Sequence, residues 1–142
     1  MAKLHLNPDA IVYDIGAGTG SVSIECAIHL TKGEVYAIER KEEAASLIEQ
    51  NAHKASADHV HVIRGIAPDV LQGLPKPTHV FVGGSSGRLE EILDQVREAN
   101  PHVRIVEMPL HWRHRANYYG MYVNMRSQMR ILLPCRFQGV RQ

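Results

Sequence analysis

Two hydrophobic patterns alternate along the first part of the chain. Short apolar runs, typical of buried strands, lie at residues 10–13, 34–39, 60–64, 78–82 and 102–106. Between these runs, apolar side chains recur every three or four positions, which predicts amphipathic helices at about residues 21–30, 42–54 and 88–99. A short helical turn is expected near residues 70–71.

The order of these elements predicts the fold class. Alternation of strands and helices with short connections is typical of an α/β protein that has a parallel sheet and right-handed crossovers. In such sheets, ligands bind beyond the carboxyl ends of the strands. We therefore expect the loops at residues 14–21, 39–40, 65–68 and 83–88 to meet at one edge of the sheet.

The first of these loops carries the strongest chemical signal. It reads Asp14-Ile15-Gly16-Ala17-Gly18-Thr19-Gly20-Ser21, with glycine at alternate positions between a strand and a helix. Glycine is required where the backbone takes a positive φ or lets a ligand approach closely. The N-terminus of the following helix offers free N–H groups to a carboxylate or phosphate. The pattern predicts the nucleotide-binding crevice of a doubly wound, Rossmann-like sheet.

The spacing of the glycines indicates which nucleotide is bound. The dinucleotide fingerprint is G-x-G-x-x-G, whereas this chain has G-x-G-x-G and places Ser21 where the third glycine would fall. The next strand ends in Glu39, about 20 residues further on, where a carboxylate can accept hydrogen bonds from ribose hydroxyls. Together these residues resemble the S-adenosyl-L-methionine site of Rossmann-like, class I methyltransferases. A small NAD-dependent oxidoreductase remains the alternative.

Composition narrows the class of protein. The 142 residues are 44% hydrophobic and 22% charged, with a net charge of +1, as in a single ordered domain. A net charge near zero argues against a nucleic-acid partner. The two cysteines are too few for a disulfide framework, and Cys26 is expected in the core. Without an apolar run of ~20 residues or a signal peptide, a cytoplasmic protein with no membrane partner is expected.

Three stretches carry a more specific resemblance. They are residues 14–25, residues 35–40 and a second glycine loop, Val82-Gly83-Gly84-Ser85-Ser86-Gly87. Over about residues 6–106, the chain resembles the precorrin-6Y C5,15-methyltransferases (decarboxylating) of cobalamin biosynthesis, in their C15-methylating, decarboxylating subunit. The resemblance implies S-adenosyl-L-methionine as cofactor and a precorrin, a tetrapyrrole, as substrate. It also implies methylation at C15, loss of a ring acetate carboxylate, and a homo-oligomer for the intact family member.

The resemblance also implies the roles of individual residues. The cofactor would contact a set drawn from the first glycine loop and the end of the second strand, namely Asp14, Gly16, Ala17, Gly18, Thr19, Gly20, Ser21, Glu39 and Arg40. Ile66 and Ala67 would line the adenine, and Gly83 and Gly84 would lie beside the methyl donor. Ile66 departs from the family, which often has an acid there. Arg88, Ser85 and Ser86 are expected on the substrate side, with Arg88 as an anchor for a carboxylate.

The implied chemistry needs little from side chains. A sulfonium methyl is already electrophilic and the tetrapyrrole supplies the carbon nucleophile, so the protein mainly holds the two in line. No catalytic acid or base can be named for the decarboxylation. The pairs His59/His61 and His111/His114 lack a third ligand at suitable spacing, and no metal site is predicted.

The pattern breaks after about residue 106. We therefore divide the chain into a cofactor-binding core, residues 1–106, and an atypical tail, residues 107–142. Residues 108–114 can be encoded by a string that, shifted by one base, reads Asn-Ala-Ile-Ala-Leu-Glu-Thr, a pattern of this family. We hypothesise that the tail is a frameshifted reading, that the sheet is truncated after the fifth strand, and that this chain is inactive. A non-enzymatic fragment or RNA-binding module is a further alternative, because arginines alternate with Trp112 and tyrosines in the tail.

Overall fold

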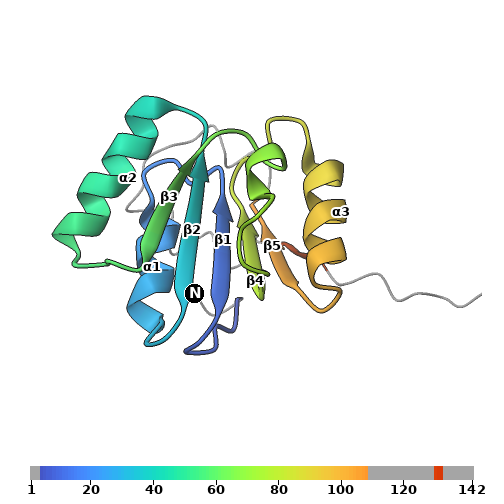
Figure 1. Ribbon diagram of the computed structural model, residues 1–142, viewed down its shortest axis with the longest axis horizontal. Helices are drawn as coiled ribbons and strands as arrows, with labels where there is room; N and C mark the ends of the chain where they lie inside the picture. The colour runs from blue at the N-terminus through green and yellow to red at the C-terminus, as the bar shows by residue number, and fades with distance from the viewer. Residues whose placement is uncertain (1–3, 109–129, 133–142) are drawn as a thin grey trace, which may run out of the picture.

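The computed structural model of the chain describes residues 4–108 and 130–132 (Figure 1). In chain order the elements are β1 (Ile11–Ile15), α1 (Ser21–His29), β2 (Glu34–Glu39), α2 (Glu42–Lys54), β3 (Val60–Arg64), the 3₁₀ turn η1 (Asp69–Leu71), β4 (His79–Val82), α3 (Leu89–Ala99), β5 (Arg104–Glu107) and β6 (Arg130–Leu132). The α/β fold predicted from the alternating pattern is confirmed.

The strands form one sheet in the order β3-β2-β1-β4-β5-β6. All pairs from β3 to β5 are parallel, and β6 runs antiparallel to β5. The chain passes from β1 to β2 on one side, whereas β4 lies on the other side of β1. The strand order therefore reverses at β1, and ligands bind doubly wound sheets at such a point, beyond the carboxyl ends of the strands.

Helices cover both faces of the sheet (Figure 1). On one face, Val22 and Cys26 of α1 pack into a buried cluster with Val12 and Val35, and Cys26 is the small core residue that we expected. On the other face, α3 contributes Ile92, Leu93 and Val96 to a cluster with strand residues that include Val80 and Ile105. These helices carry apolar residues at helical spacing because each buries one stripe against the sheet.

The observed bounds differ from the predicted ones mainly at β5. This strand begins at Arg104, not at residue 102, because a turn precedes it. The backbone N–H groups of His102 and Val103 donate to the side-chain and main-chain oxygens of Asn100, both at 3.0 Å. The helical turn expected near residues 70–71 is the short 3₁₀ turn η1.

The sheet does not end at its fifth strand. Ile131 of β6 pairs with Val106 of β5, so a short strand from beyond residue 106 covers the edge of the fifth strand. Apart from residues 107–108 and β6, the tail lies outside the described residues, and the frameshift hypothesis stays a prediction that the nucleotide sequence tests. None of the helices in residues 4–108 and 130–132 has the length and apolar character that a membrane crossing requires.

Candidate functional site

The first glycine loop needs glycine for two physical reasons. Gly16, Gly18 and Gly20 all have positive φ, at 70°, 59° and 79°. In addition, a Cβ atom on Gly16 would lie 2.6 Å from the backbone N of Gly84, and one on Gly20 would lie 2.8 Å from Ile48 Cγ2. Gly20 also caps α1. Left-handed backbone and close approach together explain the alternating pattern.

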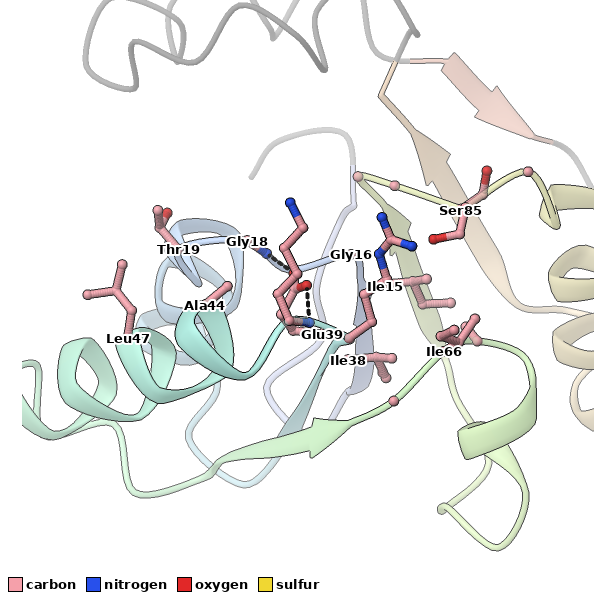
Figure 2. A pocket seen from close by; sticks show the side chains of 18 residues that line it. Ile15, Gly16, Gly18, Thr19, Ile38, Glu39, Ala44, Leu47, Ile66 and Ser85 are labelled. Carbon is pink, nitrogen blue, oxygen red and sulfur yellow. Dashed lines mark hydrogen bonds between the residues drawn. The ribbon is translucent and has the colours of Figure 1, made fainter.

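Glu39 is bound to this loop through its carboxylate. The Gly18 N–H donates to Oε2 at 2.8 Å, and the Lys41 N–H donates to Oε1 at 3.0 Å (Figure 2). The side chain is largely buried at the carboxyl end of β2. A carboxylate oxygen has two lone pairs, so each oxygen can accept a further hydrogen bond from a ligand hydroxyl.

The second glycine loop, residues 83–87, lies against the first. The N–H groups of Gly83 and Gly84 both donate to the Ile15 carbonyl, at 2.9 and 3.2 Å. Ser85 is buried and Ser86 is exposed, with a left-handed φ of 51°. Because β1 and β4 are neighbours in the sheet, two loops far apart in sequence meet backbone to backbone.

A pocket of about 620 Å³ opens where these loops meet, within the range of small-molecule sites. Its walls come from both glycine loops, the end of β2, the start of α2 and the loop after β3. Figure 2 shows Ala44 and Leu47 on one side of Glu39 and Ile66 on the other. Leu47 and Ile66 are 39% and 40% exposed, so two large apolar side chains flank this opening without being covered.

Most of the predicted site residues line this pocket. They are Gly16, Gly18, Thr19, Glu39, Arg40, Ile66, Ala67, Gly83, Gly84, Ser85 and Ser86. Five predicted residues are not among the described lining residues: Asp14, Ala17, Gly20, Ser21 and Arg88. The pocket is also lined by residues that were assigned no role from the sequence, namely Ile15, Ile38, Lys41, Ala44, Leu47, Gly65 and Gly87.

Asp14 supports the loop from beneath. It is 1% exposed, and its Oδ2 accepts a hydrogen bond from Ser23 Oγ at 2.6 Å. Its Oδ1 is buried without a hydrogen-bond partner in the described structure. Burial raises the pKa of Asp14 from 3.8 to about 6; the Ser23 hydrogen bonds oppose this shift and the Glu39 charge adds to it. Asp14 therefore joins the end of β1 to α1 through Ser23 and is not among the described residues that line the pocket.

Arg88 is occupied by carboxylates of the protein itself. Its Nη1 and Nη2 donate to the two oxygens of Asp69 at 2.9 and 3.0 Å. Its Nη2 also donates to Glu91 at 2.7 Å, and its Nε donates to the same carboxylate. The hydrogen bonds from Arg88 hold the pKa of both carboxyls below its usual value. Arg88 is also not among the described residues that line the pocket, and its expected role as a substrate anchor stays a prediction.

Charge is unevenly distributed around the pocket. Among the described lining residues, the charged ones are Glu39, Arg40 and Lys41, which follow one another at the end of β2. The second glycine loop contributes only glycine and serine. One side of the pocket can therefore form charged hydrogen bonds, whereas the other offers backbone and hydroxyl groups.

The pair His59/His61 has partners within the protein, whereas the pair His111/His114 lies outside the described residues. His59 Nε2 lies 2.8 Å from the Ala27 carbonyl, and His61 Nε2 contacts the Glu34 carboxylate. The His61 ring also stacks on Tyr36, with centroids 5.1 Å apart. Within the described part of the chain, no three His, Cys, Asp or Glu side chains are placed to hold a metal ion.

Comparison with known sequences finds one family for most of the chain. The precorrin methyltransferase domain matches residues 1–129. The cobalt-precorrin-6B C15-methyltransferase (decarboxylating) of Salmonella typhimurium is 38% identical over 94 residues, which is 66% of this chain and 48% of that protein. The chain thus spans about half the length of the curated relatives that it matches.

Solved structures give the same relationship. The precorrin-6y C5,15-methyltransferase of Geobacter metallireducens superimposes with a TM-score of 0.73 and 35% identity, over 87% of this chain and 65% of that one. The precorrin 8w decarboxylase of Methanobacterium thermoautotrophicum gives a TM-score of 0.72 and 30% identity, over 89% and 64%.

Proposed function

Because the chain belongs to the precorrin methyltransferase family and has its class I fold, we propose that it is an S-adenosyl-L-methionine-dependent C-methyltransferase acting on a cobalt-precorrin. The reaction would methylate C15 with decarboxylation, the two steps that the name of the Salmonella relative states, and the group decarboxylated would be the ring acetate that the sequence resemblance implies. One observation carries the proposal. Two glycine loops and a strand-end carboxylate surround a single pocket of about 620 Å³.

The residues present fit the proposed cofactor. The backbones of Gly16 and Gly84 approach so closely that a Cβ on Gly16 would collide, which leaves bare main chain at the pocket wall. The Glu39 carboxylate would accept hydrogen bonds from the ribose hydroxyls, and Ile66 and Ala67 would contact the adenine. Arg40 and Thr19 line the same pocket. When bound, the cofactor supplies a sulfonium-activated methyl group that needs no further activation.

The chain's own contribution to methyl transfer is positioning. Of the described residues that line the pocket, Glu39 alone carries a carboxylate, and two backbone N–H groups already bind it. A general base is therefore not offered beside the second glycine loop. Holding donor and acceptor at near-attack distance can itself supply several kcal/mol of the rate enhancement.

The second glycine loop would face the tetrapyrrole. Gly83 and Gly84 permit a flat substrate to approach the backbone, and Ser85 and Ser86 offer hydroxyl groups to its polar edge. Among the described residues on this side of the pocket there is no cation, so hydroxyl and backbone groups are the donors that it offers to a bound acetate. The macrocycle would accept the electron pair as the acetate loses CO2.

Calorimetric titration of the folded chain with S-adenosylhomocysteine tests the cofactor assignment. We expect binding by the parent chain and loss of binding in Gly18→Val, whose branched side chain would fill the left-handed turn. Binding of NAD in place of S-adenosylhomocysteine would instead support the oxidoreductase alternative. Unchanged affinity in Gly18→Val would show that the first glycine loop is not the site.

A further inference from the structure

Arg88, Asp69 and Glu91 form a three-residue ion cluster, here called the Arg88 clip, beside the pocket. All three guanidinium nitrogens are hydrogen-bonded. The contact with Asp69 is bidentate, with one nitrogen on each carboxylate oxygen. Bidentate arginine–carboxylate pairs fix orientation as well as distance.

The clip connects two of the loops that make the pocket. Asp69 begins η1, whose Val70 N–H donates to the carbonyl of Ile66, a pocket residue. Arg88 directly follows the second glycine loop, and its own N–H donates to the Ser85 carbonyl at 2.9 Å. In Figure 1 the green turn of residues 69–71 lies beside the start of α3. Ile66 and Ser85 are therefore connected through the backbone of residues 69–70, the Arg88–Asp69 ion pair and the hydrogen bond from the Arg88 N–H.

We propose that Arg88 is a positioning residue that holds the loop after β3 and the second glycine loop at a fixed separation. This inference rests on the proposed function for its effect on ligand affinity, but its structural part does not. Glu91 completes the cluster from the first turn of α3. The Arg88 side chain is 31% exposed, whereas its carboxylate partners are 66% and 58% exposed, so the cation is the more enclosed member.

The same contacts argue against a direct role in holding substrate. To reach a substrate carboxylate, Arg88 would have to leave two carboxylates that it already binds. Two acids around one cation also leave the clip with a net negative charge, which repels an anionic tetrapyrrole. The role proposed for Arg88 is therefore to fix the positions of the two loops and not to contact the ligand.

A double-mutant cycle with two readouts tests the proposal. The variants are Arg88→Ala, Asp69→Ala and their combination, together with Arg88→Lys, which keeps the charge but cannot bind both oxygens of Asp69 at once. The readouts are hydrogen–deuterium exchange of residues 65–71 and 83–88 in the ligand-free chain, and affinity for S-adenosylhomocysteine. Arg64→Ala is the matched control, because Arg64 also binds two carboxylates, Glu42 and Glu49, but both lie on α2.

Each single alanine variant is expected to speed exchange in both loops and to weaken the affinity about two- to fivefold, the range of a well-formed exposed ion pair. The combined variant should be no worse than either single one, and Arg64→Ala should leave both loops unchanged. The proposal would be wrong if the effects of Arg88→Ala and Asp69→Ala were strictly additive, or if the loops exchanged in Arg88→Ala as they do in the parent chain. Failure of the parent chain to bind the ligand would count against the proposed function alone, because the exchange cycle still decides the clip.

Discussion

The two glycine loops of the pocket use the same residue for different reasons. In the first loop, three glycines take left-handed φ values, and at Gly16 and Gly20 a side chain would collide with neighbouring atoms. In the second loop, a Cβ on Gly84 would meet only Gly16 Cα at 3.9 Å, an ordinary contact. Glycine is thus needed for the fold at Gly16 and Gly20, whereas at Gly84 its missing side chain leaves room for a ligand.

The largest expected effect comes from placing alanine in the first loop, with the same change in the second loop as the comparison. Gly16→Ala should lower the free energy of unfolding by about 2–4 kcal/mol, because left-handed strain adds to the collision with Gly84. Gly84→Ala should change it by less than about 0.5 kcal/mol while weakening ligand binding. Urea denaturation of both variants checks the contrast. Equal losses of stability would remove the distinction between the loops.

The buried acid beneath the first loop predicts a pH dependence. The pKa of Asp14 is raised from 3.8 to about 6, so between these values the folded chain keeps a proton that the unfolded chain releases. Stability should therefore fall as pH rises through this window, by on the order of 3 kcal/mol, and stay lower above it. Asp14→Asn should lack this fall.

The predicted fall of stability is checked by measuring the free energy of unfolding of Asp14→Asn and of the parent chain at about pH 4 and pH 7. The carboxyls with lowered pKa, such as Glu42 and Asp69, contribute a slope of opposite sign, but they do so in both proteins. The difference between the two proteins isolates Asp14. Parallel curves would mean that Asp14 does not titrate in this window.

Removing the acid that joins the first loop to β2 should weaken binding. Glu39→Ala is expected to cost about 1.5–3 kcal/mol in S-adenosylhomocysteine affinity, because it loses ribose acceptors and frees the Gly18 N–H. Glu34→Gln, at the other end of the same strand, is the control and should bind as the parent chain does. Calorimetry on both variants measures the effect, and a normal affinity in Glu39→Ala would contradict the ribose role.

The smallest effect is expected at the apolar wall. Ile66→Ala should weaken S-adenosylhomocysteine binding by about 0.5–1 kcal/mol, because a partly exposed side chain loses apolar contact with the adenine. Ile28→Ala removes an equally large side chain that is 69% exposed on α1 and should have no effect. If the two variants bind alike, Ile66 is not part of the adenine site.

Backbone requirements made much of the site predictable from sequence. Gly16 and Gly18 were predicted because only glycine readily takes the left-handed turn after a strand. Glu39 was predicted because a strand end places its side chain at the sheet edge where ligands bind. Such local rules act within a few residues, and the sequence displays them directly.

The features that were missed depend on distant partners. Ala44 and Leu47 have the apolar spacing of a core-facing helix, and that spacing is the same whether a helix faces the core or a pocket. Arg88 was expected to meet substrate, but its orientation is set by Asp69, which precedes it by a strand and several turns. The strand β6 pairs with β5, and the sequence between them shows neither the strand pattern nor the helix pattern of apolar residues.

The contact between Gly16 and Gly84 has a consequence for folding. Gly16 and Gly84 lie in the loops that follow the neighbouring strands β1 and β4, which are far apart in sequence. The pocket wall therefore cannot exist before this long-range pairing is complete, and a ligand that needs the wall binds only chains in which β1 and β4 have paired. Its binding energy accordingly adds to the stability of the whole sheet, so cofactor would protect the completed topology against unfolding.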